Sequence, residues 1–172
     1  HTRWSIHAMW RDQALMLRLQ RGEPIVYLNA KDCKAKGIVD GDRLAIRGGS
    51  AGGLLVAACM TLRPDLFCSV VAEVPFVDVV STMSDPTLPL TITEWEEWGD
   101  PREEPMAGYM LSYSPYDHTV PAAYPAVYIT AGLNDPRVSY HEPAKWIAKL
   151  RSVRTNDATL IMRCEMGAGH GG

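Results

Sequence analysis

The sequence predicts an α/β domain built on a mostly parallel sheet with helices on both faces. Short runs rich in β-formers alternate along the chain with apolar runs of helix length, an order typical of this layered architecture. Polar, Gly-rich loops follow several of the predicted strands, where open parallel sheets build their sites. A length of 172 residues suits one such domain with a sizeable core.

Each element follows from its apolar pattern and its end signals. Predicted strands cover residues 42–47, 69–74, 125–131 and 159–164, and predicted helices cover residues 5–20, 30–36, 54–62 and 141–151. A short apolar helix or turn is expected over residues 76–83. Pro64 ends the third helix, and basic residues toward the end of the fourth favour its dipole. Residues 84–108 are rich in Pro, Asp and Glu, which predicts a long excursion over the loop edge of the sheet.

Ser50 stands between the predicted strand 42–47 and the predicted helix 54–62. Its neighbours Gly48 and Gly52 complete the pattern G-x-S-x-G, the signature of a strained turn that exposes a serine hydroxyl as a nucleophile. Side chains at the two glycines would clash where strand and helix pack closely. A plain strand-to-helix turn is the alternative, and the strand–turn–helix order favours the nucleophile.

Asp135 and His170 supply the acid and the base that such a serine needs. Each lies in a loop after a predicted strand, and the order serine, acid, histidine is that of α/β-hydrolases. Taken alone, Asp135 is a turn-former before Pro136, and His170 is a solvated loop histidine. Together they predict a triad in which His170 takes the proton of Ser50 and Asp135 holds the imidazole. The backbone N–H of Ala51 is the predicted oxyanion donor.

These residues and their neighbours resemble a known family. The segments GGSAGG at 48–53, DPRV at 135–138 and GHGG at 169–172 are similar to those of the prolyl oligopeptidase family of serine peptidases. The resemblance runs from about Gly37 to the last residue. Three further segments look like the oligopeptidase B branch, which cleaves peptides after Arg or Lys. They are VPFVDVV at 74–80, EWEEWGDP at 94–101 and SYSPYD at 112–117.

The resemblance implies further site residues. Glu94 and Glu96 match the positions that hold the basic side chain before the scissile bond, and Arg137 matches an arginine that hydrogen-bonds the substrate backbone. Two carboxylates suit a guanidinium, because charge-assisted bidentate bonds offset the cost of desolvation. A solvated acidic loop is the alternative for the glutamates, and a surface arginine for Arg137. Trp95 and Trp98 either wall this pocket or pack the excursion.

The sequence also departs from the family pattern. In the family, a second oxyanion donor is the hydroxyl of a tyrosine in a His/Gly-rich segment that precedes the nucleophile turn, or elbow. Tyr27 is the one tyrosine before Ser50 in this sequence, and it lacks such neighbours. The family's β-propeller and the usual residues after the histidine have no counterpart. We therefore expect a catalytic-domain portion over residues 31–172, an unassigned segment over residues 1–30 that packs on this domain, and an incomplete fold.

Composition excludes several function classes. The net charge of −3 gives no basic footprint for nucleic acid, and no apolar stretch approaches the roughly 18 residues of a membrane span. The histidines show no metal-binding spacing, so neither a metal nor a cofactor is expected. The four cysteines form no C-x-x-C pair and are expected as buried free thiols in a reducing, cytoplasmic compartment. The oligomeric state stays open.

Three functions are compatible with these residues. The first is a serine endopeptidase that cuts short basic peptides after Arg or Lys. The second is another α/β-hydrolase, such as an esterase or an acylaminoacyl-type peptidase. The third is an inactive truncated fragment, because only one oxyanion donor, Ala51, is visible in the sequence.

Overall fold

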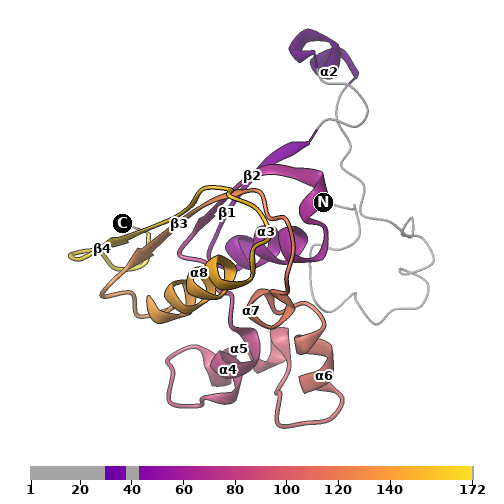
Figure 1. Cartoon of the computed structure of the whole chain (residues 1–172). Coiled ribbons are helices and arrows are strands. Elements are labelled where there is room, and N and C mark those ends of the chain that lie inside the picture. Colours follow the sequence, from indigo (N-terminus) through magenta and orange to yellow (C-terminus); the bar gives the residue numbers. More distant parts are fainter. Residues whose placement is uncertain (1–29, 38–42, 172) are drawn as a thin grey trace. The chain divides into compact units, whose positions relative to one another are not determined.

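The computed structural model describes residues 30–37 and 43–171, and the chain falls into two units, 1–42 and 43–172. In the first unit the described residues form helix α2 (Ala30–Lys36), as predicted. All other described elements belong to the second unit (Figure 1). The helix predicted over residues 5–20 lies outside the described residues.

Four parallel strands form one sheet in the order β1-β2-β3-β4 (Figure 1). They are β1 (Leu44–Gly49), β2 (Phe67–Glu73), β3 (Ala126–Gly132) and β4 (Leu160–Glu165), and each overlaps a predicted strand. Because the strands are parallel, their carboxyl ends meet at one edge of the sheet. The loops that follow β1, β3 and β4 therefore begin close together, and these are the loops that carry the serine, the acid and the histidine.

Two long helices pack against one face of this sheet. Helix α3 (Ala51–Leu62) contacts β1 and β2, and helix α8 (His141–Val153) contacts β3 and β4. The main core lies between these helices and alternate strand positions, and includes Val56, Ala57, Met60, Val70, Ala72, Val127, Ile129, Trp146, Ile147 and Leu150.

The opposite face of the sheet is more polar. It carries the exposed Arg47–Glu73 ion pair and Ile161, which is 48% exposed. Within residues 43–171 the two long helices thus cover a single face, whereas the sequence predicted helices on both. The parallel α/β sheet itself is confirmed.

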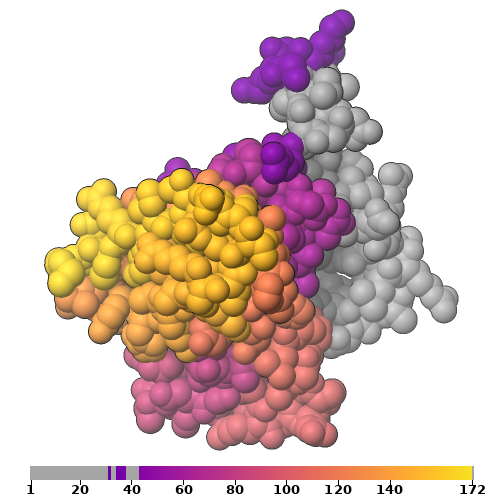
Figure 2. Space-filling model, viewed as in Figure 1, coloured from indigo at the N-terminus to yellow at the C-terminus, as the bar shows by residue number. Residues whose placement is uncertain are grey.

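The segment between β2 and β3 forms a small helical lobe beside the main core. It contains α4 (Val79–Ser84), α5 (Thr91–Trp98), α6 (Met106–Leu111) and α7 (Pro115–His118). A second apolar cluster holds the lobe together and includes Leu54, Phe76, Val79, Met83, Met110 and Val138. Figure 2 shows the lobe as a continuous pink surface below the yellow and orange of α8 and β4. The predicted excursion over residues 84–108 is therefore partly helical, and its Trp95 and Trp98 pack against this second cluster.

The remaining predictions concern the end of α3 and the thiols. Pro64 ends α3 as predicted and begins η2 (Pro64–Leu66), which leads into β2. Cys59 and Cys164 are half-buried free thiols, and burial raises the pKa of the Cys59 thiol. Cys68 is exposed, so the expectation of a buried thiol is wrong there.

None of the described helices has both the length and the apolar character needed to cross a bilayer.

Candidate active site

Ser50 occupies a strained turn between β1 and α3. Its backbone has φ 54° and ψ −120°, a region that residues other than glycine rarely adopt. Three backbone hydrogen bonds hold the turn. The Ser50 N–H donates to the Glu73 carbonyl at 2.8 Å, and the Ser50 carbonyl accepts from the N–H groups of Leu54 at 3.0 Å and Phe76 at 3.3 Å. Strain of this kind persists only where surrounding contacts impose it, and it is concentrated at functional sites.

The glycines around Ser50 have different roles. A Cβ added at Gly48 would lie 2.1 Å from the Gly52 carbonyl oxygen, so the strand can approach the helix only without a side chain there. A Cβ at Gly53 would lie 2.7 Å from Pro75, which follows β2. At Gly52 a Cβ would meet nothing within 4 Å among the described residues. The steric prediction is therefore confirmed at Gly48 and wrong at Gly52, where Gly53 makes the close approach instead.

The structure brings Ser50, His170 and Asp135 into one hydrogen-bonded chain. Ser50 Oγ lies 3.0 Å from His170 Nε2, and His170 Nδ1 lies 2.8 Å from Asp135 Oδ2. The Asp135 side chain is fully buried, and that of His170 is 16% exposed. A buried carboxylate next to Nδ1 favours the tautomer with the proton on Nδ1. In that tautomer Nε2 is free to accept the serine proton.

The loop after β3 holds Asp135 in place. Oδ1 of Asp135 accepts hydrogen bonds from the backbone N–H groups of Arg137 at 2.8 Å and Val138 at 3.0 Å. These bonds fix one carboxylate oxygen in a local turn, which is a common use of aspartate in loops. The other oxygen faces His170, so the local turn orients the side chain for the long-range contact.

The loop after β4 is attached to the loop after β3. The N–H of Leu133 donates to the Glu165 carbonyl at 2.9 Å, and the N–H of Asn134 donates to the Ala168 carbonyl at 3.0 Å. A Cβ at Gly132 would lie 2.3 Å from the Gly169 carbonyl oxygen, so the two backbones touch at this point. This contact places the residue after Gly169, which is the histidine, above the serine.

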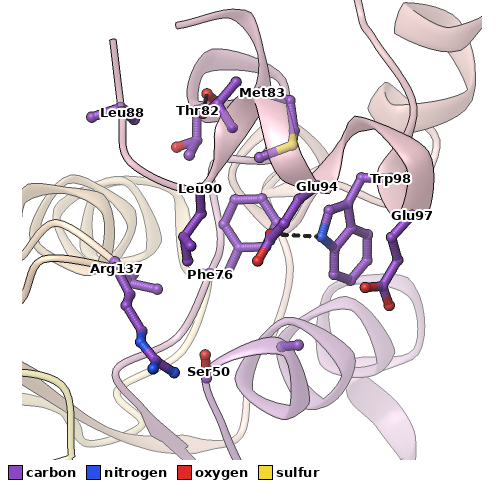
Figure 3. Close-up of a pocket in the computed structure, with 13 residues that line it drawn as sticks. Ser50, Phe76, Thr82, Met83, Leu88, Leu90, Glu94, Glu97, Trp98 and Arg137 are labelled. Atoms are coloured by element: carbon purple, nitrogen blue, oxygen red, sulfur yellow. Dashed lines mark hydrogen bonds between the residues drawn. The ribbon is translucent and has the colours of Figure 1, made fainter. Parts of the chain in front are cut away.

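A pocket opens directly beside Ser50 (Figure 3). Ser50 and Ala51 lie at one side of it, and Arg137 and Val138 come from the loop after β3, which also carries Asp135. The lobe provides the remaining lining residues, which are Phe76, Thr82, Met83, Leu88, Leu90, Thr91, Glu94, Glu97 and Trp98. Figure 3 shows the Ser50 hydroxyl, the Arg137 guanidinium and the Glu94 carboxylate pointing toward the same space.

The structure separates the acidic residues of α5. Glu94 lines the pocket, and its Oε2 accepts a hydrogen bond from the indole N–H of Trp98 at 3.0 Å. Glu96 is exposed and is not among the lining residues, whereas Glu97 is. Residues two apart on a helix point to nearly opposite sides, and residues three apart share a face. The carboxylates that share the pocket are therefore Glu94 and Glu97, and the predicted Glu94–Glu96 pairing is not observed.

The two tryptophans of α5 divide the roles that the sequence left open. Trp98 lines the pocket and packs edge to face on Phe76, with ring centroids 5.6 Å apart. Trp95 packs against the second core cluster and donates its indole N–H to the Met83 carbonyl at 3.0 Å. One tryptophan thus walls the pocket, and the other fastens α5 to α4.

Sequence reasoning missed Glu142, a buried carboxylate near the pocket. It is 2% exposed, and its pKa is raised to about 7 because burial penalises the charged form. The hydrogen bond from Thr82 lowers this pKa and the charge of Asp135 raises it. In the sequence, Glu142 lies in the first turn of a predicted helix, where an acidic residue is already accounted for by the helix dipole.

Among the described residues, no cluster of three or more His, Cys, Asp or Glu side chains is arranged to hold a metal ion.

Sequence comparisons relate the chain to known peptidases. The profile of the prolyl oligopeptidase family matches residues 27–172. Protease 2 of Moraxella lacunata is 58% identical over 130 residues, which are 76% of this chain and 19% of that protein. Dipeptidyl aminopeptidase BI of Pseudoxanthomonas mexicana is 50% identical over 131 residues, which are 76% of this chain and 18% of that protein.

Solved structures show the same relationship. Oligopeptidase B from Leishmania major has a TM-score of 0.75 and 48% identity, covering 82% of this chain and 20% of its own. Oligopeptidase B from Trypanosoma brucei, solved in a closed form with covalently bound antipain, has the same values. This chain spans about a fifth of the length of these relatives. The profile match, the sequence identities and the shared α/β-hydrolase fold together show that the chain belongs to the prolyl oligopeptidase family.

Proposed function

We propose that the site is that of a serine peptidase that cleaves short peptides after arginine or lysine. The observation that carries the proposal is the continuous chain from Ser50 Oγ through His170 to Asp135, beside a pocket that contains Glu94. Membership of a peptidase family supports the reaction class, and the oligopeptidase B relatives support the substrate class. The catalytic portion predicted over residues 31–172 includes the whole of this site.

In the proposed reaction, Ser50 Oγ attacks the scissile carbonyl while His170 Nε2 takes its proton. The tetrahedral intermediate collapses when His170 returns that proton to the leaving amine, which leaves an acyl-enzyme on Ser50. Water then attacks the acyl-enzyme, with His170 again as the base. Asp135 keeps the imidazole in the required tautomer and stabilises the imidazolium.

Oxyanion stabilisation is assigned to the N-terminus of α3. The N–H of Ala51 belongs to the first turn of the helix, where backbone donors have no partner within the helix. Such a donor aimed at the developing oxyanion typically contributes about 2.7–4 kcal/mol. No residue is assigned as the second donor; Tyr27, the one tyrosine upstream of Ser50, lies outside the described residues.

The preference for a basic side chain is assigned to the wall of the pocket formed by α5. Glu94 is oriented by the Trp98 indole, and the apolar side chains of Phe76 and Met83 line the same pocket. A guanidinium or ammonium group entering this pocket gains a charge-assisted bond that a neutral side chain cannot offer. Arg137, on the other side of Ser50, is assigned to the substrate backbone.

Labelling with a fluorophosphonate tests the nucleophile. We expect the chain to form a stable covalent adduct at Ser50, because Ser50 Oγ lies 3.0 Å from the base. Ser50→Ala should abolish the adduct, and the matched control Ser152→Ala, at an exposed position on α8, should keep it. Intact-mass analysis measures both. A folded wild-type chain that stays unlabelled contradicts the proposal and favours an inactive chain.

Glu94→Gln tests the substrate class. We expect kcat/KM for an arginyl peptide amide to fall by about 10- to 100-fold, since a hydrogen bond to a charged group contributes about 1.5–3 kcal/mol. Glu103→Gln is the matched control, because Glu103 is an exposed acidic residue outside the pocket. Glu96→Gln decides whether this exposed carboxylate joins Glu94 when substrate is bound. Equal rates on arginyl amides, prolyl amides and short acyl esters would contradict the basic preference.

One relative supports a second candidate function. Dipeptidyl aminopeptidase BI is 50% identical, and its name describes release of dipeptides from a free amino terminus. The same arginyl amide, prepared with a free and with a blocked amino group two residues before the bond, separates the two activities. Cleavage of only the free form identifies an aminopeptidase, and cleavage of the blocked form identifies an endopeptidase.

A further inference from the structure

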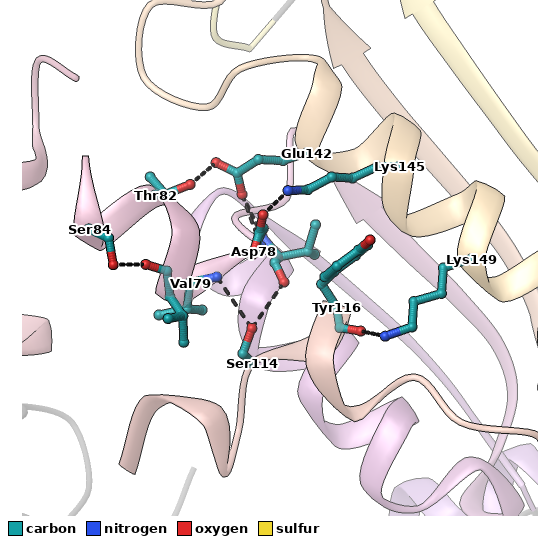
Figure 4. Close-up of polar contacts among 11 residues, drawn as sticks. Asp78, Val79, Thr82, Ser84, Ser114, Tyr116, Glu142, Lys145 and Lys149 are labelled. Carbon is teal, nitrogen blue, oxygen red and sulfur yellow. Dashed lines mark hydrogen bonds and ion pairs between the residues drawn. The ribbon is translucent and has the colours of Figure 1, made fainter. Parts of the chain in front are cut away.

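Glu142 is a buried acidic side chain, only 2% exposed, and the proposed mechanism does not use it. It projects from the first turn of α8 into the seam between that helix and the lobe (Figure 4). Oε2 accepts hydrogen bonds from the backbone N–H groups of Val77 at 3.1 Å and Asp78 at 3.0 Å. Oε1 accepts a hydrogen bond from the Thr82 hydroxyl at 2.6 Å.

These bonds continue into the pocket wall. Thr82 lines the pocket, and its carbonyl accepts a hydrogen bond from the hydroxyl of Thr91, the first residue of α5, at 2.8 Å. The carbonyl of the next residue, Met83, accepts a hydrogen bond from the indole N–H of Trp95. Helix α5 is therefore attached to α4 at two points, and α4 is attached to α8 through Glu142.

The backbone of Glu142 contacts the loop after β3, which carries Asp135. Its backbone N–H donates to the Ser139 carbonyl at 3.0 Å, one residue after Val138, whose own N–H binds Asp135. Glu142 thus connects the loop that holds Asp135 with the wall that carries Glu94. The link is short and runs through buried and partly buried groups, so a change at Glu142 is transmitted by packed contacts.

We propose that Glu142 is a positioning residue for substrate recognition, which holds α4 and thereby the α5 wall with Glu94 at its working distance from Ser50. The inference rests on the proposed function, because it concerns how the pocket beside Ser50 binds a basic side chain. Glu142 touches neither the substrate pocket nor the reacting atoms in this arrangement; it acts through Thr82.

The Glu142–Thr82 bond also depends on the protonation state of Glu142. The carboxylate only accepts, so Thr82 must donate to it, whereas the neutral acid can donate from Oε1 and turn the Thr82 hydroxyl around. The charged groups around Glu142 are Lys145 on the same helix, Asp78 on the segment after β2, and Asp135 on the loop after β3. Lys145 is paired with Asp78, so it does not neutralise Glu142 directly.

Two substitutions at Glu142 distinguish the effect of its negative charge from the effect of its hydrogen bonds. Glu142→Gln keeps an oxygen for the two backbone donors and an N–H₂ group for Thr82, so it imitates the neutral acid. Glu142→Leu leaves all three donors without an acceptor. We expect Glu142→Leu to raise KM for an arginyl amide about tenfold, equivalent to about 1.4 kcal/mol, with a smaller change in kcat. It should also shift the NMR signal of the Trp95 indole N–H, whatever the activity.

Substitutions at Thr82 keep the test decisive if Glu142→Leu does not fold. Thr82→Val removes the hydroxyl at nearly constant volume and should raise KM roughly threefold, and Thr82→Ser should restore the wild-type value. Thr119→Val is the matched control. Thr119 is a buried hydroxyl bonded to Trp146 and the Pro115 carbonyl, away from the pocket, so its loss should lower thermal stability without changing KM or the Trp95 signal.

The pH dependence supplies a readout that a merely structural role would not move. In the wild type the Trp95 indole signal should change with a midpoint near pH 7, and in Glu142→Gln this change should be absent. Because the pKa is raised from 4.5 in the folded chain, the stability contributed by neutral Glu142 is fully present below pH 4.5 and lost as pH rises through about 7. Glu142→Gln should therefore lose less stability than the wild type over this range.

The inference is overturned if Glu142→Leu and Thr82→Val keep the wild-type KM and Trp95 signal and lose only thermal stability. Loss of the pH-dependent Trp95 signal in Glu142→Gln, together with the KM changes, supports it. Fluorophosphonate labelling reports on Ser50 and the indole signal reports on the wall. Failure of the proposed function and failure of this inference are thus separate outcomes.

Discussion

Replacing His170 with alanine is expected to lower kcat on an arginyl peptide amide by roughly 10⁴- to 10⁶-fold while the fold is kept. The substitution removes the group that takes the serine proton and the group that returns it to the leaving amine. The fold is expected to persist because Asp135 retains two backbone donors, from Arg137 and Val138, for its buried carboxylate. Steady-state kinetics and thermal unfolding of the same preparation measure the two effects.

His141→Ala is the matched control for this prediction. His141 is an exposed histidine at the start of α8, outside the pocket lining, so kcat should stay within about twofold of the wild type. The rate of fluorophosphonate labelling should fall in His170→Ala, because Ser50 loses its base, and stay unchanged in His141→Ala. A His170→Ala protein within tenfold of the wild-type kcat would mean that another group activates Ser50.

The three residues of the proposed triad could be predicted from sequence for a physical reason. Ser50, Asp135 and His170 each follow a strand within a few residues, and strands of a parallel sheet end at one edge. Local pattern therefore implies proximity over long separations in sequence, in this case 120 residues between Ser50 and His170. The same argument does not give distances, which depend on how the loops after β3 and β4 touch.

The substrate pocket was less predictable. Acidic residues at 94, 96 and 97 were visible, but which of them share a face depends on α5 being a helix over Thr91–Trp98. The Pro-, Asp- and Glu-rich composition predicted a long excursion and concealed the helical period of 3.6 residues. Glu142 was invisible for a different reason. Its partners are two backbone N–H groups and a hydroxyl that lie 60 to 65 positions earlier, and no local pattern encodes such a contact.

The steric argument at the elbow was right in kind and wrong in one position. The pattern G-x-S-x-G suggests that both glycines are needed for close packing, yet Gly52 has open space among the described residues. The close approach falls on Gly53, because the chain after β2 passes over α3 at Pro75. A motif thus marks the turn correctly, while the particular contact is decided by the neighbouring strand.

Gly132→Ala is expected to lower kcat/KM by at least about 100-fold, although Gly132 touches no substrate. A Cβ there would lie 2.3 Å from the carbonyl oxygen of Gly169 and 2.8 Å from that of Ala168. Because both oxygens belong to the backbone, this steric overlap can be relieved only if the backbone of the loop moves. The loop that moves carries His170 one residue later. A displacement near 1 Å of a reacting group is enough for an effect of about this size.

Gly167→Ala is the matched control, because it lies in the same loop and a Cβ there would meet nothing within 4 Å among the described residues. It should leave kcat/KM within about twofold of the wild type. Labelling with the fluorophosphonate should slow in Gly132→Ala and not in Gly167→Ala, since the distance from Ser50 Oγ to His170 Nε2 is the quantity disturbed. If Gly132→Ala retains full activity, the β3 loop can yield without moving His170, and the contact between the two loops does not position the histidine.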